Sequence, residues 1–367
     1  MMKTILFILL AIHGLIHFLG FTKAFKLAEV SQLNQPIGKT AGLLWLMAGL
    51  LFLAAAAMII MKADWWWIIA LSAIIISQLL IIMNWQDAKF GSIANIILLL
   101  VVIGGFGIWN FHRNFVSDYT EALSRTGKQT SNLLTESDIL HLPLPVRSYL
   151  RYSGVLNRPK VMSAKITFEG QMHGKGKDWM DIRSTQYNFY DTPTRLFYMT
   201  AKMKGLTVPG YHAYKNGIAT MKASLFGLFP VVNVSGKEMN QAETVTIFND
   251  MCLMTPATLI SPDIKWTEID SLSSKATFTC NGITISAILS FNESGQLVNF
   301  ISDDRFDISG GKPEQIRFST PVSEYRNING INVCSKANAV WHYPEGEFVY
   351  GRFNLRSIEY NVKDNQK

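Results

Sequence analysis

Long apolar runs dominate the start of the chain. Short polar connections separate four of them, at residues 5–21, 37–61, 65–83 and 93–109. Because about 20 apolar residues are enough to cross a bilayer as a helix, each run predicts a transmembrane helix. Three tryptophans at residues 65–67 begin the third run, as expected for an aromatic belt at a membrane surface. We therefore predict a four-helix transmembrane region over residues 1–113 of a multi-pass integral membrane protein, with the lipid bilayer as its partner.

Few polar side chains interrupt these runs, and each is costly in lipid. His13 and His17 are four residues apart and share one helix face, while Gln78 and Asn95 lie within the third and fourth runs. Two histidines could serve a metal or haem site or a proton relay. Since two ligands are too few to define a metal site, we predict no metal. We expect these polar groups to face the bundle interior and bond to one another across helices.

The hydrophobic pattern changes to a period of two from about residue 160, which is typical of half-buried β-strands. Asn-Gly pairs at residues 216–217, 281–282 and 329–330 separate successive runs and indicate hairpin turns. About eleven such runs predict an antiparallel barrel or a large curved sheet. Residues 237–260 instead have helical spacing and predict one helix, or two broken at Pro256, against the sheet.

Three parts follow from these patterns. They are the transmembrane region (1–113), a polar juxtamembrane connector (114–158) and a β-rich extramembrane domain (159–367). The predicted fold class is an α-helical membrane region followed by a mainly antiparallel β domain, a half-barrel or curved sheet with an inserted helix. This is the plan of half-barrel lipid carriers, so a lipid or amphiphile is the first candidate ligand.

Composition narrows the possible functions. Charged residues are 17% of the chain, below the quarter or so of a soluble domain, which agrees with a part in lipid. The net charge of +7 is divided into +4 on residues 1–113 and +3 on the remainder. No run of basic residues supplies the dense positive face that nucleic acid requires. Three distant cysteines exclude a disulfide scaffold and a Cys-rich zinc module.

Sequence motifs for catalysis are missing. The chain has no zinc-protease helix motif, no nucleophile elbow, no phosphate loop and no dinucleotide glycine fingerprint. We therefore assign no catalytic residue and no cofactor, and an enzyme is the less favoured class. The three cysteines are expected to be buried thiols.

Candidate ligand-binding residues lie on the predicted strands. Asp304 and Arg305 end one strand, and arginine can pair with a carboxylate through two hydrogen bonds. Such a pair could line a cavity and orient a head group, or lie exposed at a sheet edge. The full candidate set is Asp304, Arg305, Trp179, Gln186, Trp266, Trp341 and His342. A methionine-rich set (Met199, Met203, Met221, Met239, Met251 and Met254) suits an adaptable apolar lining or a core equally well.

Particular segments resemble a known family. These are FKLAEVSQL at residues 25–33, LPVRSYLRYSG at 144–154, TPATL at 255–259, Trp266 and Asp304-Arg305. Together with the four apolar runs they resemble an uncharacterised bacterial membrane-protein family with a domain of unknown function. The resemblance implies a fold outline and no activity. Residues 259–304 are also remotely similar to the periplasmic lipoprotein-carrier fold, although four spans would prevent this domain from shuttling.

The sequence leaves three functions open. The first is a β domain that presents an apolar, concave surface to a lipid or amphiphile beside the bilayer. The second is a structural or sensory membrane protein that binds a protein partner of unknown identity. The third is an enzyme acting on a membrane-derived substrate. Because lipid carriers of this plan work in the cell envelope, we expect the β domain to be extracytoplasmic.

Overall fold

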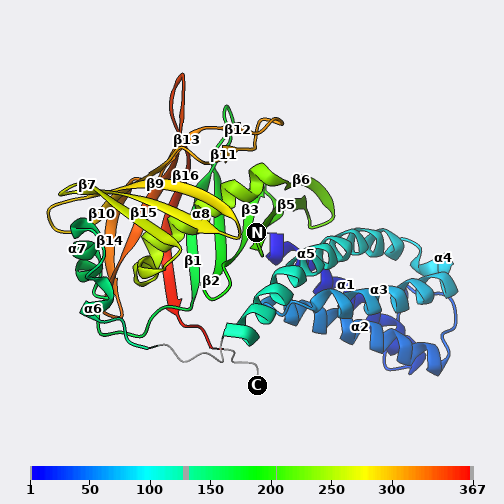
Figure 1. Ribbon diagram of the computed structural model, residues 1–367. Coiled ribbons are helices and arrows are strands. Elements are labelled where there is room, and N and C mark those ends of the chain that lie inside the picture. Colours follow the sequence, from blue (N-terminus) through cyan, green and yellow to red (C-terminus); the bar gives the residue numbers. More distant parts are fainter. Residues whose placement is uncertain (1, 127–131, 204, 364–367) are drawn as a thin grey trace. The chain divides into compact units, whose positions relative to one another are not determined.

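The computed structural model describes residues 2–126, 132–203 and 205–363 (Figure 1). Residues 127–131 of the predicted connector, residue 204 of the predicted β-rich domain and both chain ends lie outside this description. The chain divides into two compact units. One is Met1–Phe111 with Phe226–Leu228, and the other is His112–Leu225 with Phe229–Lys367.

The first unit is built from helices. They are α1 (Met2–Ala24), α2 (Lys39–Ile60), α3 (Trp66–Met83), the single turn α4 (Trp85–Ala88) and α5 (Gly91–Thr126). Four of these helices, all except α4, are long and apolar enough to cross a membrane, as predicted. Gly14 of α1 and Gly49 of α2 allow close packing, because a Cβ on Gly14 would lie only 3.0 Å from the carbonyl oxygen of Gly49. Large apolar side chains such as Ile12 and Leu15 remain exposed, as lipid-facing residues would be.

The last of these helices is longer than its apolar run. The run ends at Trp109, but α5 continues to Thr126 and includes residues that the sequence pattern assigns to a connector. Its final turns belong to the second unit, where they carry an aromatic face. The ring of Phe115 lies 5.4 Å from that of Tyr198, and Tyr119 stacks on Tyr187 at 4.5 Å. These contacts explain why a mostly polar segment remains helical.

A single large antiparallel sheet forms most of the second unit. Its strands run in the order β6-β5-β4-β3-β2-β1-β16-β15-β13-β10-β9-β8-β7, with β14 paired to β15. The bounds are β1 (Ser163–Met172), β2 (Met180–Phe189), β3 (Thr194–Met203), β4 (Leu206–Lys215), β5 (Ile218–Leu225), β6 (Phe229–Ser235), β7 (Ile264–Asp270), β8 (Ser273–Cys280), β9 (Ile283–Phe291), β10 (Leu297–Ser302), β13 (Arg317–Ser319), β14 (Val322–Ile328), β15 (Ile331–Tyr343) and β16 (Gly346–Tyr360). The sheet is curved and not closed, since β6 and β7 are its two edges. This confirms the predicted curved sheet.

Hairpin turns set the register of this sheet. Asn216 and Gly217 join β4 to β5 and both have positive φ, 52° and 76°. That backbone suits the twist of a two-residue hairpin, and asparagine and glycine tolerate it best. A second, small sheet pairs β11 (Phe306–Asp307) with β12 (Glu314–Gln315).

One helix lies inside the curve of the sheet. It is α8 (Lys237–Met254), labelled in Figure 1. The short 3-10 helix η1 (Pro256–Ile260) follows it, so the segment breaks at Pro256. The helix contacts β5 and β6 from one end of the strand order and β9, β10 and β15 from the other part, and it also contacts β11 of the small sheet. Most of its residues are buried, including polar ones. Two further short helices, α6 (Glu136–Ile139) and α7 (Leu144–Ser153), precede the sheet. All three cysteines are buried thiols, as expected.

Candidate functional site

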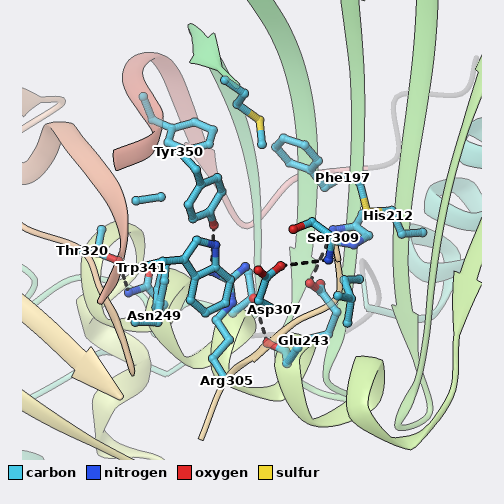
Figure 2. Close-up of a pocket in the computed structure, with 18 of the residues that line it drawn as sticks. Phe197, His212, Glu243, Asn249, Arg305, Asp307, Ser309, Thr320, Trp341 and Tyr350 are labelled. Carbon is cyan, nitrogen blue, oxygen red and sulfur yellow. Dashed lines mark hydrogen bonds and ion pairs between the residues drawn. The ribbon is translucent and has the colours of Figure 1, made fainter. Parts of the chain in front are cut away.

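A cavity lies between α8 and the concave face of the sheet (Figure 2). Its volume is about 340 Å³. Small-molecule sites usually fall between about 300 and 1,000 Å³ and are mainly apolar with a few converging polar groups. The described residues of this cavity have both features.

The periodicities of the strands and of α8 place the lining residues around one cavity. On β15, Ala337, Ala339 and Trp341 line the cavity, as expected when alternate residues share one face of a strand. On α8, Ala242, Thr246 and Leu253 line it too, at spacings that fall on one helix face. The cavity is therefore a product of the sheet's curvature and of a helix that does not fill it completely.

Most of the wall is apolar. It includes five methionines and a set of aromatic rings (Met172, Met199, Met221, Met239, Met254, Phe168, Phe197, Phe306, Phe318, Phe348 and Phe353). Methionine is unbranched and polarisable, so it adapts to irregular apolar shapes. Of the methionines singled out in the sequence, four line the cavity, whereas Met251 is buried in the core and Met203 is exposed. The wall suits a flexible hydrocarbon chain.

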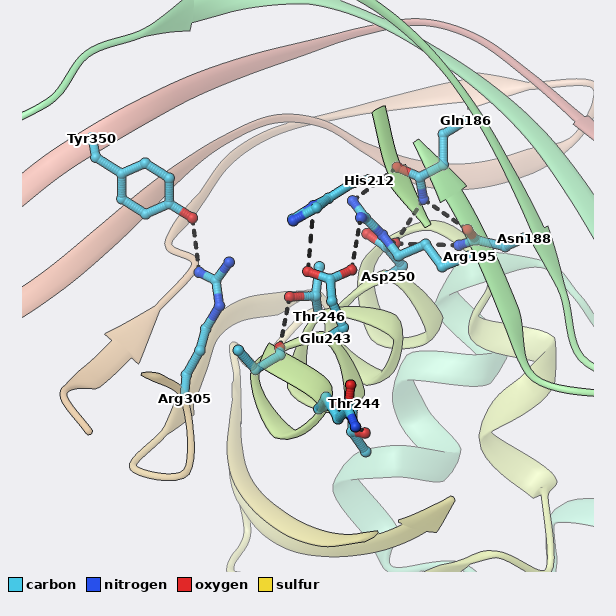
Figure 3. Close-up of polar contacts among 12 residues, drawn as sticks. Gln186, Asn188, Arg195, His212, Glu243, Thr244, Thr246, Asp250, Arg305 and Tyr350 are labelled. Carbon is cyan, nitrogen blue, oxygen red and sulfur yellow. Dashed lines mark hydrogen bonds and ion pairs between the residues drawn. The ribbon is translucent and has the colours of Figure 1, made fainter. Parts of the chain in front are cut away.

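A buried charged network forms one part of the wall (Figure 3). Arg195 on β3 donates from Nε to Asp250 Oδ2 at 2.7 Å and from Nη1 to Glu243 Oε2 at 3.1 Å. Gln186 and Asn188 on β2 donate to the same Asp250 oxygen at 2.6 and 3.3 Å. Both carboxylates come from α8, so this network ties the inserted helix to the sheet.

His212 on β4 extends the network into the cavity. Its Nδ1 lies 3.4 Å from Glu243 Oε1, while its Nε2 is buried and has no hydrogen-bond partner among the described residues. Burial lowers the pKa of His212 to about 4, against the opposing effect of Glu243, and the positive charges of Arg195 and Arg305 lower it further. Burial alone would raise the pKa of Glu243, but His212, Arg195 and Arg305 outweigh it and lower that pKa. At neutral pH the histidine is uncharged and the glutamate ionised.

Arg305 is a polar residue of the cavity wall outside this charged network. Its Nη1 donates to the hydroxyl of Tyr350 at 2.7 Å. Its guanidinium carbon lies 4.0 Å from the ring centre of Phe318 and 4.9 Å from that of Trp341. Its Nε is buried without a partner among the residues that the structure describes. This arginine is oriented by aromatic rings and keeps a donor available.

Arg305 does not pair with Asp304, contrary to the pairing that the sequence suggested. Asp304 instead accepts hydrogen bonds from the backbone N–H and the hydroxyl of Ser286, at 2.6 and 3.1 Å. Neighbouring Asp303 forms the two-bond pair with Arg317, and both of those side chains are more than half exposed. The carboxylate–arginine pair of this segment is thus an exposed one at the surface, and only Arg305 faces the cavity.

The other candidates divide between the cavity and its surroundings. Trp341 lines the cavity, and Gln186 lies behind the wall, where it holds Asp250 and accepts from Arg195 at 3.2 Å. His342 points elsewhere, with Nε2 2.7 Å from the hydroxyl of Ser319.

Two tryptophans of the candidate set do not line the cavity. Trp179 stacks on His173 at 3.8 Å, below the guanidinium of Arg352. Trp266 packs against the core and donates from its indole nitrogen to the carbonyl of Leu259 at 3.3 Å. Both tryptophans make packing contacts, and the assignment of any of the candidate residues to a ligand stays a prediction.

Sequence reasoning missed the charged network. Arg195, His212, Glu243 and Asp250 were not among the candidates. The one available signal was the spacing of Glu243 and Asp250, which are seven residues apart and so share a face of a helix that is otherwise largely buried. Their partner Arg195 is 48 and 55 residues away in sequence.

The polar residues of the first unit form their own network. His13 donates from Nε2 to Oδ1 of Asn95 at 2.9 Å, and Ser77 Oγ lies 2.8 Å from His17 Nε2. Asn95 donates to Gln78 Oε1 at 3.0 Å, which brings Gln78 into the network through Asn95. These groups satisfy one another across three helices, and no group of metal-ligating side chains occurs within the described part of the chain.

Comparison with known proteins places the chain in a family without assigning an activity. No curated protein matches it. Among solved structures, the LolA superfamily protein NE2245 from Nitrosomonas europaea is similar over 60% of this chain and 94% of that chain, with a TM-score of 0.36 and 10% identity. Residues 132–353, more than half of the chain, match a family described as being of unknown function. The chain belongs to this family, DUF6544.

Proposed function

We propose that the β domain binds the hydrocarbon chain of an amphiphile in the cavity under the curved sheet. The observation that carries this proposal is the cavity itself, about 340 Å³ between α8 and the sheet, with a mainly apolar wall that includes five methionines and six phenylalanines. Burying a hydrocarbon chain there would remove apolar surface from water on both partners, at about 0.8 kcal/mol for each methylene.

The polar part of the wall favours an amphiphile over a pure hydrocarbon. Arg305 and His212 each present a buried nitrogen without a partner among the described residues, and unpaired buried polar atoms are costly. A ligand with a polar end would satisfy them. The four apolar helices on the same chain make the bilayer the natural source of such a ligand. We place the domain on the extracytoplasmic side, with residues 1–113 as its anchor and 114–158 as connector.

An enzyme acting on a membrane-derived substrate is supported less well. The contact between His212 and Glu243 has the form of a base and its orienting carboxylate. A nucleophilic enzyme would also place a hydroxyl or thiol at hydrogen-bond distance from His212 Nε2. Within the described residues that atom has no such partner, so binding is the better supported function.

A cavity-filling substitution tests the proposal. Ala339→Trp would put an indole into the cavity, whereas Asn338→Trp puts the same group on the opposite face of β15. Full-length protein in detergent-free peptidiscs would be titrated with N-phenyl-1-naphthylamine, a probe that fluoresces in apolar sites.

We expect the wild type and Asn338→Trp to bind the probe alike, with thermal unfolding as a check on folding. Ala339→Trp should weaken probe binding at least tenfold. The indole would displace apolar probe surface equal to two or more buried methylene groups, and burying that surface is worth about tenfold in affinity. Equal binding by Ala339→Trp and the wild type would refute the proposal.

A further inference from the structure

Two arginines line the cavity, and their surroundings differ. Arg195 has two carboxylate partners, Asp250 and Glu243, and its side chain is 8% exposed. Arg305 forms no ion pair within 4.0 Å among the described residues. Among the described residues its side chain donates one hydrogen bond, to the neutral hydroxyl of Tyr350. Arg305 is half-buried, and its Nε is buried without a partner among the described residues, which is unusual for a charged side chain.

Aromatic rings hold this arginine in place without neutralising it. Phe318, Trp341 and Tyr350 surround the guanidinium, with their ring centres 4.0, 4.9 and 5.8 Å from its central carbon. Such contacts attract a cation through the electron-rich ring faces but add no negative charge. The buried Nε, which lacks a partner in the described structure, stays available as a charged hydrogen-bond donor.

Nearby carboxylates are engaged elsewhere. Asp304 accepts two hydrogen bonds from Ser286, and Asp303 is paired with Arg317. Asp307 accepts from the hydroxyl of Tyr343 at 2.6 Å and from the backbone N–H of Ser309 at 2.9 Å. Glu243 and Asp250 are bound to Arg195. None of these five carboxylates forms an ion pair with Arg305 within 4.0 Å, which leaves its buried Nε available to an anion from outside the described residues.

We propose that Arg305 binds the anionic head group, a carboxylate or a phosphate, of the amphiphile whose chain fills the cavity. This inference rests on the proposed function. The head group would accept from the Nε of Arg305, beside Tyr350 and Trp341, and the chain would lie against the methionine-rich wall (Figure 2). Among the described cationic side chains that line the cavity, Arg195 is paired with Glu243 and Asp250, and Lys175 is paired with Glu345 at 2.6 Å. His212 is uncharged at neutral pH. Arg305 is therefore the group that would give this part of the cavity a preference for an anion.

Ligands with one chain and different head groups test the inference. Dodecanoate, dodecyl phosphate, dodecanol and dodecyltrimethylammonium would each compete with N-phenyl-1-naphthylamine on the full chain in peptidiscs, at a mildly alkaline pH that ionises the acid. The variants are Arg305→Gln and, as a matched control, Arg317→Gln, which removes an exposed arginine outside the cavity. The acid and the phosphate distinguish a fatty-acid source from a phospholipid-like one.

We expect at least one of the two anions to bind about ten- to a hundredfold more tightly than dodecanol, the range of a charge-assisted hydrogen bond. Arg305→Gln should abolish this preference and leave dodecanol binding within about twofold, and Arg317→Gln should keep the preference. Equal binding of the alcohol and both anions, or tighter binding of the cation, overturns the inference while the proposed function stands. If none of the four competes, the proposed function fails and the inference with it. The comparison of head groups on the wild type needs no variant to fold.

Discussion

Arg195 joins α8 to the sheet through two buried ion pairs, to Glu243 and to Asp250. Arg195→Met would leave Glu243 and Asp250 without their cation, in sites where their side chains are 1% and 13% exposed. Removing one partner of a buried ion pair usually costs about 3–5 kcal/mol, because the remaining charge is buried and uncompensated. For a unit of this size that corresponds to a fall of roughly 6–20 °C in the unfolding midpoint.

The assay is thermal unfolding of the full chain followed by tryptophan fluorescence. Arg183→Met is the matched control, since Arg183 lies on the adjacent strand β2, is 80% exposed and pairs with Glu169 at 3.3 Å. An exposed pair of this kind contributes at most about 1 kcal/mol. Adding Glu243→Gln and Asp250→Asn to Arg195→Met should recover part of the loss, because the unpaired charges are then gone. A loss below about 1 kcal/mol, or no recovery in the triple variant, would refute the reasoning.

Two further predictions concern the second unit. His212 has a pKa of about 4 in the folded chain against an ordinary 6.5, so the unfolded chain takes up a proton first and stability falls as the pH drops through that window. The free energy of unfolding should fall by roughly 2 kcal/mol between about pH 7.5 and about pH 5. His212→Gln, unfolded at the same two pH values, should show a smaller fall. An unchanged fall contradicts this assignment. Asp118 on α5 accepts from the Tyr211 hydroxyl and from Lys215 Nζ, both at 2.5 Å. Asp118→Ala should raise deuterium exchange of residues 112–126 about tenfold, because charged hydrogen bonds are worth about 1.5–3 kcal/mol, and unchanged exchange there would argue against the contact.

The sequence predicted the elements that follow from local periodicity. Long apolar runs marked the four candidate spans, and a period of two with Asn-Gly turns marked the sheet. The helix inside the sheet was also predictable, since residues 237–260 interrupt the alternation. The extension of α5 to Thr126 was not, because Phe115 and Tyr119 gain their apolar contacts only from strands far along the chain.

Long-range partners limited the prediction of the site. Arg305 was singled out from its place at a strand end, but its neighbours Phe318, Trp341 and Tyr350 come from β13, β15 and β16. The adjacent Asp304 looked like its partner because it was next in sequence. In a strand, successive side chains point to opposite faces, and beyond the strand end that rule gives no guidance on which carboxylate an arginine will meet.

Photo-crosslinking tests most directly whether the cavity holds a hydrocarbon chain. The full chain, in native membranes, would be labelled with a fatty acid that carries a diazirine in its chain, and the labelled peptides would be mapped by mass spectrometry. We predict label on peptides from β3, α8 and β15, around Met199, Met239 and Trp341, and its loss in Ala339→Trp. Label confined to α1, α2, α3 and α5, or cavity label that persists in Ala339→Trp, would contradict the account.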